Sequence, residues 1–301
     1  MGGYPALVAR GNNYRKGENI LLLFAYNVCF MGSAAAKLRA ELVERAKGFA
    51  IKHALPHCLS YGEETTVCFE AYGARRHGNF HPSSYKRIVA VPTSRVRLQK
   101  VHTTARRQLP SSENGRRREL DTCTSSDALL MNLFCHPASR RCKALGALLG
   151  IDIGWVPEFG LRARVPLTDG KVDRTEIDMR IGDLLVEAKL TEGDFQRARK
   201  GALDRYRDFD AVFEKTELPQ TEEEYASYQL IRGFLAAHAQ NGSFCLLTDA
   251  RRPDLIESWY ATLRCVKILE LRVGCKVLTW QELAHAAPQS LRVFLSEKYG
   301  L

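Results

Sequence analysis

Apolar residues recur at helical spacing along several stretches of this sequence. Residues 34–55 are predicted to form an amphipathic helix whose buried stripe consists of Leu38, Leu42, Ala46 and Phe49. Other stretches carry helix-boundary residues, such as a capping Ser or Thr and a Pro in the first turn. These predict helices that begin at Thr124 or Ser125, span 195–214, run from the Thr221–Glu224 capping box through Ala239, and run from Pro253 through Val266.

Other segments alternate between apolar and polar residues, which is the period of a half-buried strand. A hairpin followed by a helical crossover and a further strand predicts an α/β fold, with a mixed sheet flanked by helices. The alternating segments are residues 155–166, 175–181 and 184–190. The short apolar run Phe244 to Thr248 is typical of a buried strand, and Lys276 to Leu278 is predicted to form a last strand.

Gly182-Asp183 is predicted to form a tight hairpin turn between the second and third strands. If these two residues form the turn, Met179 faces Val186 on the apolar side, which supports this register. On the polar side, Asp178 faces Glu187 and Glu176 faces Lys189.

Two carboxylates directly opposite each other repel unless a positive charge lies between them. A divalent cation is the natural occupant, because oxygen ligands select Mg²⁺ or Mn²⁺. Lys189 lies on the same face as Glu187 and can reach a bound water or a phosphate. The alternative is that these charges form the solvated face of an ordinary hairpin, with Glu176 and Lys189 as a weak ion pair.

Asp178, followed by Glu187-Ala188-Lys189 on the next strand, resembles the PD-(D/E)XK, or restriction-endonuclease-like, nuclease superfamily, in one of its bacterial branches. The resemblance covers roughly residues 121–280 and departs from the motif at Ile177, where the superfamily name has proline. It implies that Asp178, Glu187 and the Ala188 carbonyl bind Mg²⁺, or Mn²⁺, and that Lys189 orients or activates the attacking water.

Four residues are weaker candidates for this site. Glu158, on the polar face of the preceding strand, is a candidate further metal ligand, and Glu176 shares the face of Asp178. The resemblance adds Asp127, as an acidic residue of the first helix, and Gln229, as a helical residue that steadies the site. Asp127 can equally be a helix N-terminal acid favoured by the dipole.

The net charge of +10 is concentrated in one region, because residues 75–118 hold twelve Lys or Arg and a single acid, Glu113. Such clustering favours a polyanionic partner, nucleic acid and most simply DNA. The alternative is a solvated basic surface. The candidate contacts are Arg75, Arg76, Arg106, Arg107, Arg116, Arg117 and Arg118.

The chain is therefore expected to contain an N-terminal extension of uncertain order over 1–33, a basic helical and loop segment over 34–120, and a nuclease-like domain over 121–301. The expected function is metal-dependent hydrolysis of nucleic acid by a DNA endonuclease. The alternative is a catalytically silent nucleic-acid-binding protein with the same fold. Nine cysteines without CxxC spacing indicate a reducing, cytoplasmic environment. Despite the apolar stretch Ile20–Ala36, no membrane partner is expected, and a homodimer is compatible with the resemblance.

Overall fold

The computed structural model describes residues 33–62, 64–73, 75–101, 107–112 and 115–301, and within these Ala34–Leu301 forms one compact unit. Most of the expected extension and of the apolar stretch Ile20–Ala36 lies outside the described residues. Across the described ranges, no helix combines the length and apolarity needed to cross a membrane.

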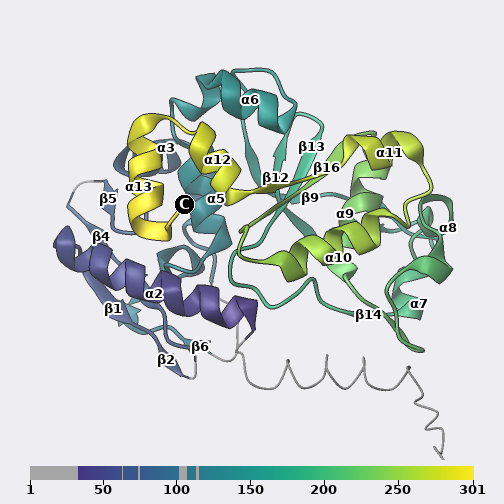
Figure 1. Cartoon of the computed structure of the whole chain (residues 1–301), viewed down its shortest axis with the longest axis horizontal. Helices are drawn as coiled ribbons and strands as arrows, with labels where there is room; N and C mark the ends of the chain where they lie inside the picture. Colours follow the sequence, from purple (N-terminus) through teal and green to yellow (C-terminus); the bar gives the residue numbers. More distant parts are fainter. Residues whose placement is uncertain (1–32, 63, 74, 102–106, 113–114) are drawn as a thin grey trace, which may run out of the picture. The chain divides into compact units, whose positions relative to one another are not determined.

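A five-stranded mixed sheet lies at the centre, in the order β17-β16-β13-β12-β9 (Figure 1). β12 runs antiparallel to both β9 and β13, whereas β13, β16 and β17 run parallel to one another. The α/β class predicted from the sequence is confirmed. The strands are β9 (Glu158–Arg162), β12 (Glu176–Ile181), β13 (Leu184–Ala188), β16 (Ser243–Thr248) and β17 (Lys276–Thr279).

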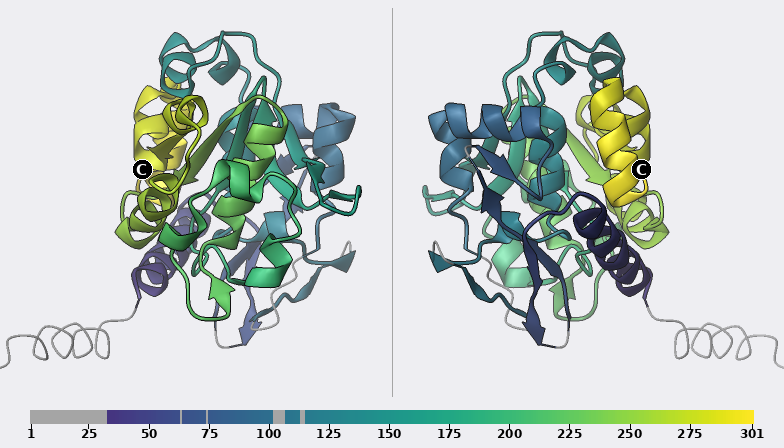
Figure 2. Two further views of the ribbon diagram at one scale, coloured as in Figure 1. Left: turned by 90° about the vertical axis from the view of Figure 1, so that its right-hand side faces the viewer. Right: turned by 90° about the vertical axis from the view of Figure 1, so that its left-hand side faces the viewer.

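Helices cover both faces of this sheet (Figures 1 and 2). On one face, a core that includes Met179 and Val186 packs against α2 (Ala34–Lys52), α5 (Ser126–Phe134), α6 (Lys143–Leu149), α12 (Trp280–Ala286) and α13 (Gln289–Tyr299). On the other, a core that includes Leu185 and Leu246 packs against α7 (Lys200–Leu203), α8 (Phe209–Val212), α9 (Tyr228–Ala239), α10 (Pro253–Leu263) and α11 (Leu269–Gly274). Every residue of β13 is buried as a result, so a charged side chain on this strand requires a compensating partner.

The segment before the first α-helix of the expected nuclease domain combines short helices with two-residue and three-residue strands. Helices α3 (Pro82–Ala90) and α4 (Pro92–Arg97) pack against α5 and β9 respectively, so α4 lies beside the central sheet. The short strands are β1 (His57–Leu59), β2 (Tyr61–Gly62), β3 (Val67–Phe69), β4 (Ala71–Tyr72), β5 (Arg76–His77), β6 (Arg107–Gln108), β7 (Ser111–Ser112) and β8 (Gly115–Arg116).

The first and last helices of the compact unit, α2 and α13, pack against each other. Lys298 of α13 is 1% exposed and donates a 2.8 Å hydrogen bond to the backbone oxygen of Asn79. Its Nζ also lies 4.5 Å from the centre of the Phe69 ring. The boundary expected at residue 120 therefore falls inside one compact unit, because residues on both sides of it share a core.

Several predicted elements appear with nearly the predicted bounds. The stripe of α2 is buried, the Ser125 side chain caps α5, and Pro253 is the first residue of α10. The helix predicted over 195–214 is wrong: β14 (Ala198–Arg199), α7 and α8 occupy it, because Ala198 pairs with Tyr225 in a strand ladder. The helix predicted from Thr221 begins only at Tyr228, since β15 (Glu224–Tyr225) takes the preceding residues.

The remaining elements are short. They are β10 (Val165–Pro166), β11 (Val172–Asp173) and three single turns of 3₁₀ helix at Glu119–Asp121, Ser139–Arg141 and Lys215–Glu217.

Candidate active site

The hairpin β12–β13 carries the three residues of the predicted catalytic motif. Its ladder pairs Ile181 with Leu184 and Met179 with Val186, so the predicted register is confirmed for these residues near the turn. The ladder ends at Met179. Beyond it, Asp178 Oδ2 accepts a 2.8 Å hydrogen bond from the backbone N–H of Ala188. This bond fixes the Asp178 carboxyl group against the end of β13, the part of the strand that holds Glu187.

The carboxyl groups of Asp178 and Glu187 interact with each other. Glu187 is only 2% exposed, and Asp178 is half-buried. Burial raises the pKa of Asp178 well above its ordinary value, and the negative charges of Glu187 and Asp127 raise it further. Lys189 and the Ala188 N–H act in the opposite direction without cancelling the effect. The negative charge around Asp178 therefore outweighs the positive charge that Lys189 supplies.

Lys189 supplies an ammonium group that is bonded directly to Glu187, one member of this pair. It is 5% exposed, and its Nζ lies 2.8 Å from Glu187 Oε1. Burial lowers the pKa of Lys189, but the nearby carboxylates of Glu187, Glu192 and Asp178 outweigh burial and raise this pKa above its ordinary value. Lys189 therefore stays protonated at neutral pH and acts as a charged hydrogen-bond donor. The expected pairing of Glu176 with Lys189 is not found in the described part of the chain.

The chain that follows Lys189 is held by two residues that the sequence analysis did not identify. Trp280 Nε1 donates a 2.8 Å hydrogen bond to the Lys189 carbonyl oxygen. Arg252, which is fully buried, donates to the carbonyl oxygens of Glu192 at 2.7 Å and Gly193 at 3.0 Å. Both residues are far from Lys189 in sequence, so no local pattern indicates them.

Asp127 and Glu176 lie close to the site, but each is bonded to a cation from the basic segment. Arg97 donates 2.6 Å hydrogen bonds to Asp127 Oδ2 through Nη2 and to Glu176 Oε1 through Nη1. Lys100 Nζ lies 2.7 Å from Asp127 Oδ2 and 3.4 Å from Glu119 Oε2. In the sequence, Arg97 and Lys100 stand out only as members of the basic segment, because tertiary contacts alone bring them here.

The network as a whole contains more negative than positive groups. Among the described residues, six carboxyl groups and three cations are joined in it by ion pairs or direct electrostatic interaction. The carboxyl groups belong to Glu119, Asp127, Glu176, Asp178, Glu187 and Glu192, and the cations to Arg97, Lys100 and Lys189. One consequence is that burial and the nearby Asp127 raise the pKa of Glu119 to about 7, although Lys100 opposes this.

The donor set at the hairpin matches a hard divalent cation. No group of three or more His, Cys, Asp or Glu side chains is arranged to hold a metal within the described ranges. Mg²⁺ does not need such a group, because it keeps several waters and takes one or two carboxylates. Asp178 and Glu187 are two such carboxylates, whose mutual repulsion is relieved when a cation lies between them.

Glu158 lies apart from these carboxylates. It stands opposite Arg180 in the ladder between β9 and β12, and Arg180 Nη2 lies 2.9 Å from both of its carboxylate oxygens. Alternation along a strand identifies the face of a residue but not which end of the sheet it occupies. We therefore leave Glu158 out of the proposed ligands.

Gln229 is linked to Lys189 in space through a single intervening residue, Phe195. Its backbone N–H donates a 3.0 Å hydrogen bond to the Phe195 carbonyl oxygen, and the Phe195 ring centre lies 5.8 Å from Lys189 Nζ. The side-chain Oε1 of Gln229 is buried and finds no hydrogen-bond partner in the described part of the protein. The described contacts thus connect Gln229 to Lys189 only through Phe195, and its role in steadying the site stays a prediction.

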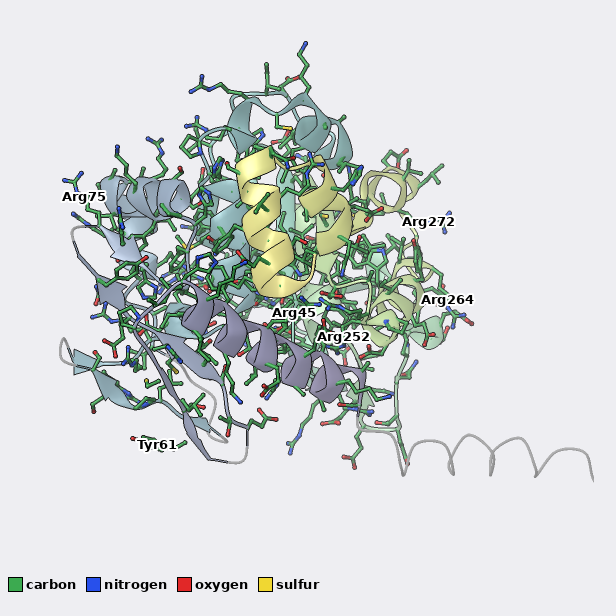
Figure 3. All side chains as sticks on the ribbon, turned by 60° about the vertical axis from the view of Figure 1, so that its left-hand side comes forward. Arg45, Tyr61, Arg75, Arg252, Arg264 and Arg272 are labelled. Carbon is green, nitrogen blue, oxygen red and sulfur yellow. The ribbon has the colours of Figure 1, made fainter. Side chains whose placement is uncertain are left out.

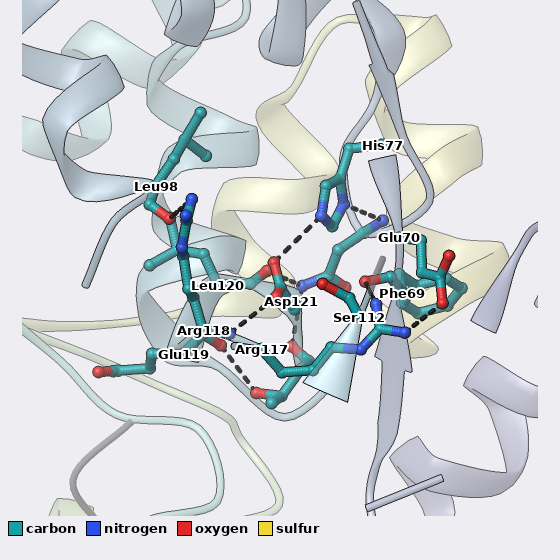
Figure 4. A network of polar contacts seen from close by, with 12 residues as sticks. Phe69, Glu70, His77, Leu98, Ser112, Arg117, Arg118, Glu119, Leu120 and Asp121 are labelled. Carbon is teal, nitrogen blue, oxygen red and sulfur yellow. Dashed lines mark hydrogen bonds and ion pairs between the residues drawn. The ribbon is translucent and has the colours of Figure 1, made fainter. Parts of the chain in front are cut away.

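The arginines predicted to contact nucleic acid, where the structure describes their side chains, divide into two groups. Arg117 is 3% exposed, bonds to the Phe69 carbonyl oxygen and forms an ion pair with Glu70, while Arg118 bonds to the Leu98 carbonyl oxygen (Figure 4). These two arginines hold the segment together. The second group consists of the exposed side chains of Arg75, Arg76 and Arg116, for which the described residues provide no ion-pair partner.

The exposed group lies on the basic segment, where Figure 3 labels Arg75. Arg264 and Arg272 lie on the opposite side of the molecule in this view, so they offer comparison sites outside the basic segment (Figure 3). Arg106 and the side chain of Arg107 lie outside the described residues.

Comparison with known families gives one match. A family model described as Restriction Endonuclease associating with ARP matches residues 38–300, which includes the hairpin, the basic segment and both helical layers. Searches of curated proteins and of solved structures gave no match.

Proposed function

We propose, on the premise that this chain belongs to the family described as Restriction Endonuclease associating with ARP, that it is a magnesium-dependent DNA endonuclease of the PD-(D/E)XK type. The family membership indicates a nuclease and a nucleic-acid substrate. The metal dependence, the choice of DNA and the PD-(D/E)XK assignment are our proposal, and they rest on the hairpin.

The observation that carries the proposal is the pair of interacting carboxyl groups at the end of a buried strand. A solvated hairpin face would leave Glu187 and Lys189 exposed, whereas both are almost fully buried. Burying an excess of carboxylates costs stability unless a cation or substrate group uses them. Functional sites are where such arrangements concentrate.

Each residue of the motif then has a distinct role. Asp178, Glu187 and the Ala188 carbonyl would hold Mg²⁺, which polarises a phosphodiester and lowers the pKa of a bound water when present. Lys189, kept protonated by its carboxylate neighbours, donates a charged hydrogen bond and stabilises negative charge that develops on the phosphate. Because it has no free lone pair in this state, Lys189 does not act as the general base.

The scaffold supports the same proposal. The hairpin is followed by a helical layer and then by β16, which runs parallel to β13 and supplies the backbone oxygen of Leu247 to the Lys189 N–H at 2.8 Å. Trp280 and Arg252 hold the next residues, so the motif lies on a rigid element as a catalytic group requires.

Incubating the purified chain with supercoiled plasmid and linear duplex DNA, with Mg²⁺ and then with a chelator, tests the proposal. We expect cleavage of closed circles that requires Mg²⁺ and is lost in Asp178→Asn and Lys189→Ala. Calorimetric titration of Mn²⁺ into wild type and Asp178→Asn tests the metal site without activity. DNA binding without cleavage, in a chain that binds no metal, would instead support the catalytically silent alternative.

A further inference from the structure

Arg97 lies inside the proposed active site although it belongs to the basic segment, residues 75–118. Its side chain is 10% exposed, and its two terminal nitrogens bond to Asp127 and Glu176 at 2.6 Å each. Charge-assisted hydrogen bonds of this length are strong and hold both partners in place. Glu176 shares a strand and a face with Asp178, two residues away, so the guanidinium lies beside the proposed metal ligand.

A glycine makes room for this guanidinium. Leu161 pairs with Ile177 and Phe159 with Met179, so the register places Gly160 opposite Asp178. Gly160 has a φ of +68°, and a Cβ added there would overlap with Arg97 Nη1 and come within 3.1 Å of Glu176 Oε2. The Arg97 guanidinium thus packs directly against the backbone of β9 at Gly160. Any side chain larger than that of glycine would occupy the space that the guanidinium fills.

Arg97 forms ion pairs with two carboxylates of the site but not with Asp178. Asp127 and Glu176 form ion pairs with Arg97 and Lys100, whereas Asp178 has no ion-pair partner in the described structure and its charge acts on Arg97 only beyond ion-pair distance. Without Arg97, the site would hold one more uncompensated negative charge next to the place where a phosphate has to approach.

We propose that Arg97, which packs against Gly160, is a positioning residue of the catalytic centre. Arg97 neutralises Asp127 and Glu176, so that Asp178 and Glu187 alone receive the metal. This inference rests on the proposed nuclease function and adds to it a residue from the basic segment. Arg97 acts through the two carboxylates and not by touching the reacting atoms.

The proposal predicts opposite effects on metal binding and on catalysis when the charge is removed. In Arg97→Met, the loss of a nearby positive charge should tighten Mn²⁺ binding on the order of fivefold. Cleavage should nevertheless slow at least about tenfold in kcat with KM little changed, since the freed carboxylates draw the metal away and repel the phosphate. Arg97→Lys keeps the charge and should recover part of kcat.

Gly160→Ala provides a second test that leaves Arg97 itself in place. The new methyl group should displace the flexible guanidinium and so reproduce the tighter Mn²⁺ binding and slower cleavage of Arg97→Met. Gly170→Ala is the matched control, because Gly170 also has a positive φ, of +78°, but a Cβ there meets nothing within 4 Å. It should bind Mn²⁺ and cleave DNA like wild type.

The measurements are Mn²⁺ titration calorimetry and single-turnover cleavage of duplex DNA, with circular dichroism and thermal melting to show that each variant is folded. If Arg97→Met and Gly160→Ala weaken metal binding and cleavage together, or change neither, the positioning role is overturned. If wild type itself neither binds Mn²⁺ nor cleaves DNA, the proposed function fails first, so the two failures are distinguishable.

Discussion

Two ion pairs that involve the β12–β13 hairpin have nearly equal lengths and very different settings. Arg180 lies 2.9 Å from Glu158 near the turn, with 54% of the Glu158 side chain exposed. Lys189 lies 2.8 Å from Glu187 at the other end, and both side chains are at most 7% exposed. Near the turn one cation meets one anion in water, whereas at the other end a buried cation faces several carboxyl groups.

The difference shows what a charged hairpin pattern can and cannot indicate. An exposed, balanced pair contributes little to stability and implies no ligand. A buried and unbalanced group is costly, so the fold keeps it only with a compensating partner. We therefore expect function at the open end of the hairpin and none near the turn, and each of the following measurements can break that distinction.

The largest expected difference is in catalysis. Lys189→Ala should lower single-turnover cleavage about a thousandfold, because a charged donor to the reacting phosphate is lost. Arg180→Ala removes the cation of the other pair and should change the rate less than about twofold. Equal losses in the two variants, both folded, would abolish the distinction between the two ends.

The next effect concerns charges that have no partner among the described residues. Replacing Arg75, Arg76 and Arg116 together with Gln, in the inactive Asp178→Asn protein, should weaken duplex binding about 10- to 100-fold at moderate salt. The slope of log affinity against log salt should fall by roughly 0.9 for each phosphate that the protein no longer neutralises. Replacing Arg264 and Arg272 is the control, and a slope unchanged in the triple variant would contradict a nucleic-acid role for the exposed group.

A smaller effect is expected on stability. Asp178→Asn should raise the free energy of unfolding by about 1–2 kcal/mol at pH 7, because it removes a carboxyl group whose pKa is raised by burial and by Glu187. Below about pH 4 both folded and unfolded wild type carry this proton, so the two proteins should then be equally stable.

Above that pH the unfolded wild type ionises first, so its stability falls with rising pH relative to the variant until the raised pKa is passed. Urea unfolding at several pH values measures this, with Asp183→Asn in the exposed turn as the control. A constant difference between wild type and Asp178→Asn at all pH values would contradict the raised pKa.

The smallest effect is expected at Glu158. Glu158→Gln should leave Mn²⁺ affinity within about twofold of wild type and shift the free energy of unfolding by less than about 0.5 kcal/mol, as for other exposed pairs. A clear loss of metal affinity would restore Glu158 to the ligand set.

The sequence predicted those features that depend on neighbouring residues. The Gly182-Asp183 turn was sufficient to predict the ladder from Met179 to Val186, and the apolar stripe of α2 was sufficient to predict its buried side. Both follow from local periodicity and turn chemistry, which act over a few residues.

What the sequence could not predict depends on contacts between distant residues. Arg97 reaches Glu176 across 79 positions, and Arg252 reaches Glu192 across 60. The segment from Phe195 to Phe213 buries its aromatic residues at nearly helical spacing, yet the ladder with β15 breaks the helix that this spacing predicts. Tertiary pairing overrides local preference there.

The contact between Lys298 and Asn79 also has a consequence for the time course of folding. These residues are 219 positions apart, and α2 completes its packing against α13 only when the final helix is present. Such long-range closure is slow and comes late, because the entropy of a long loop is lost before any contact forms. We therefore expect the segment that carries α4 and Arg97 to become ordered only once synthesis has passed residue 298.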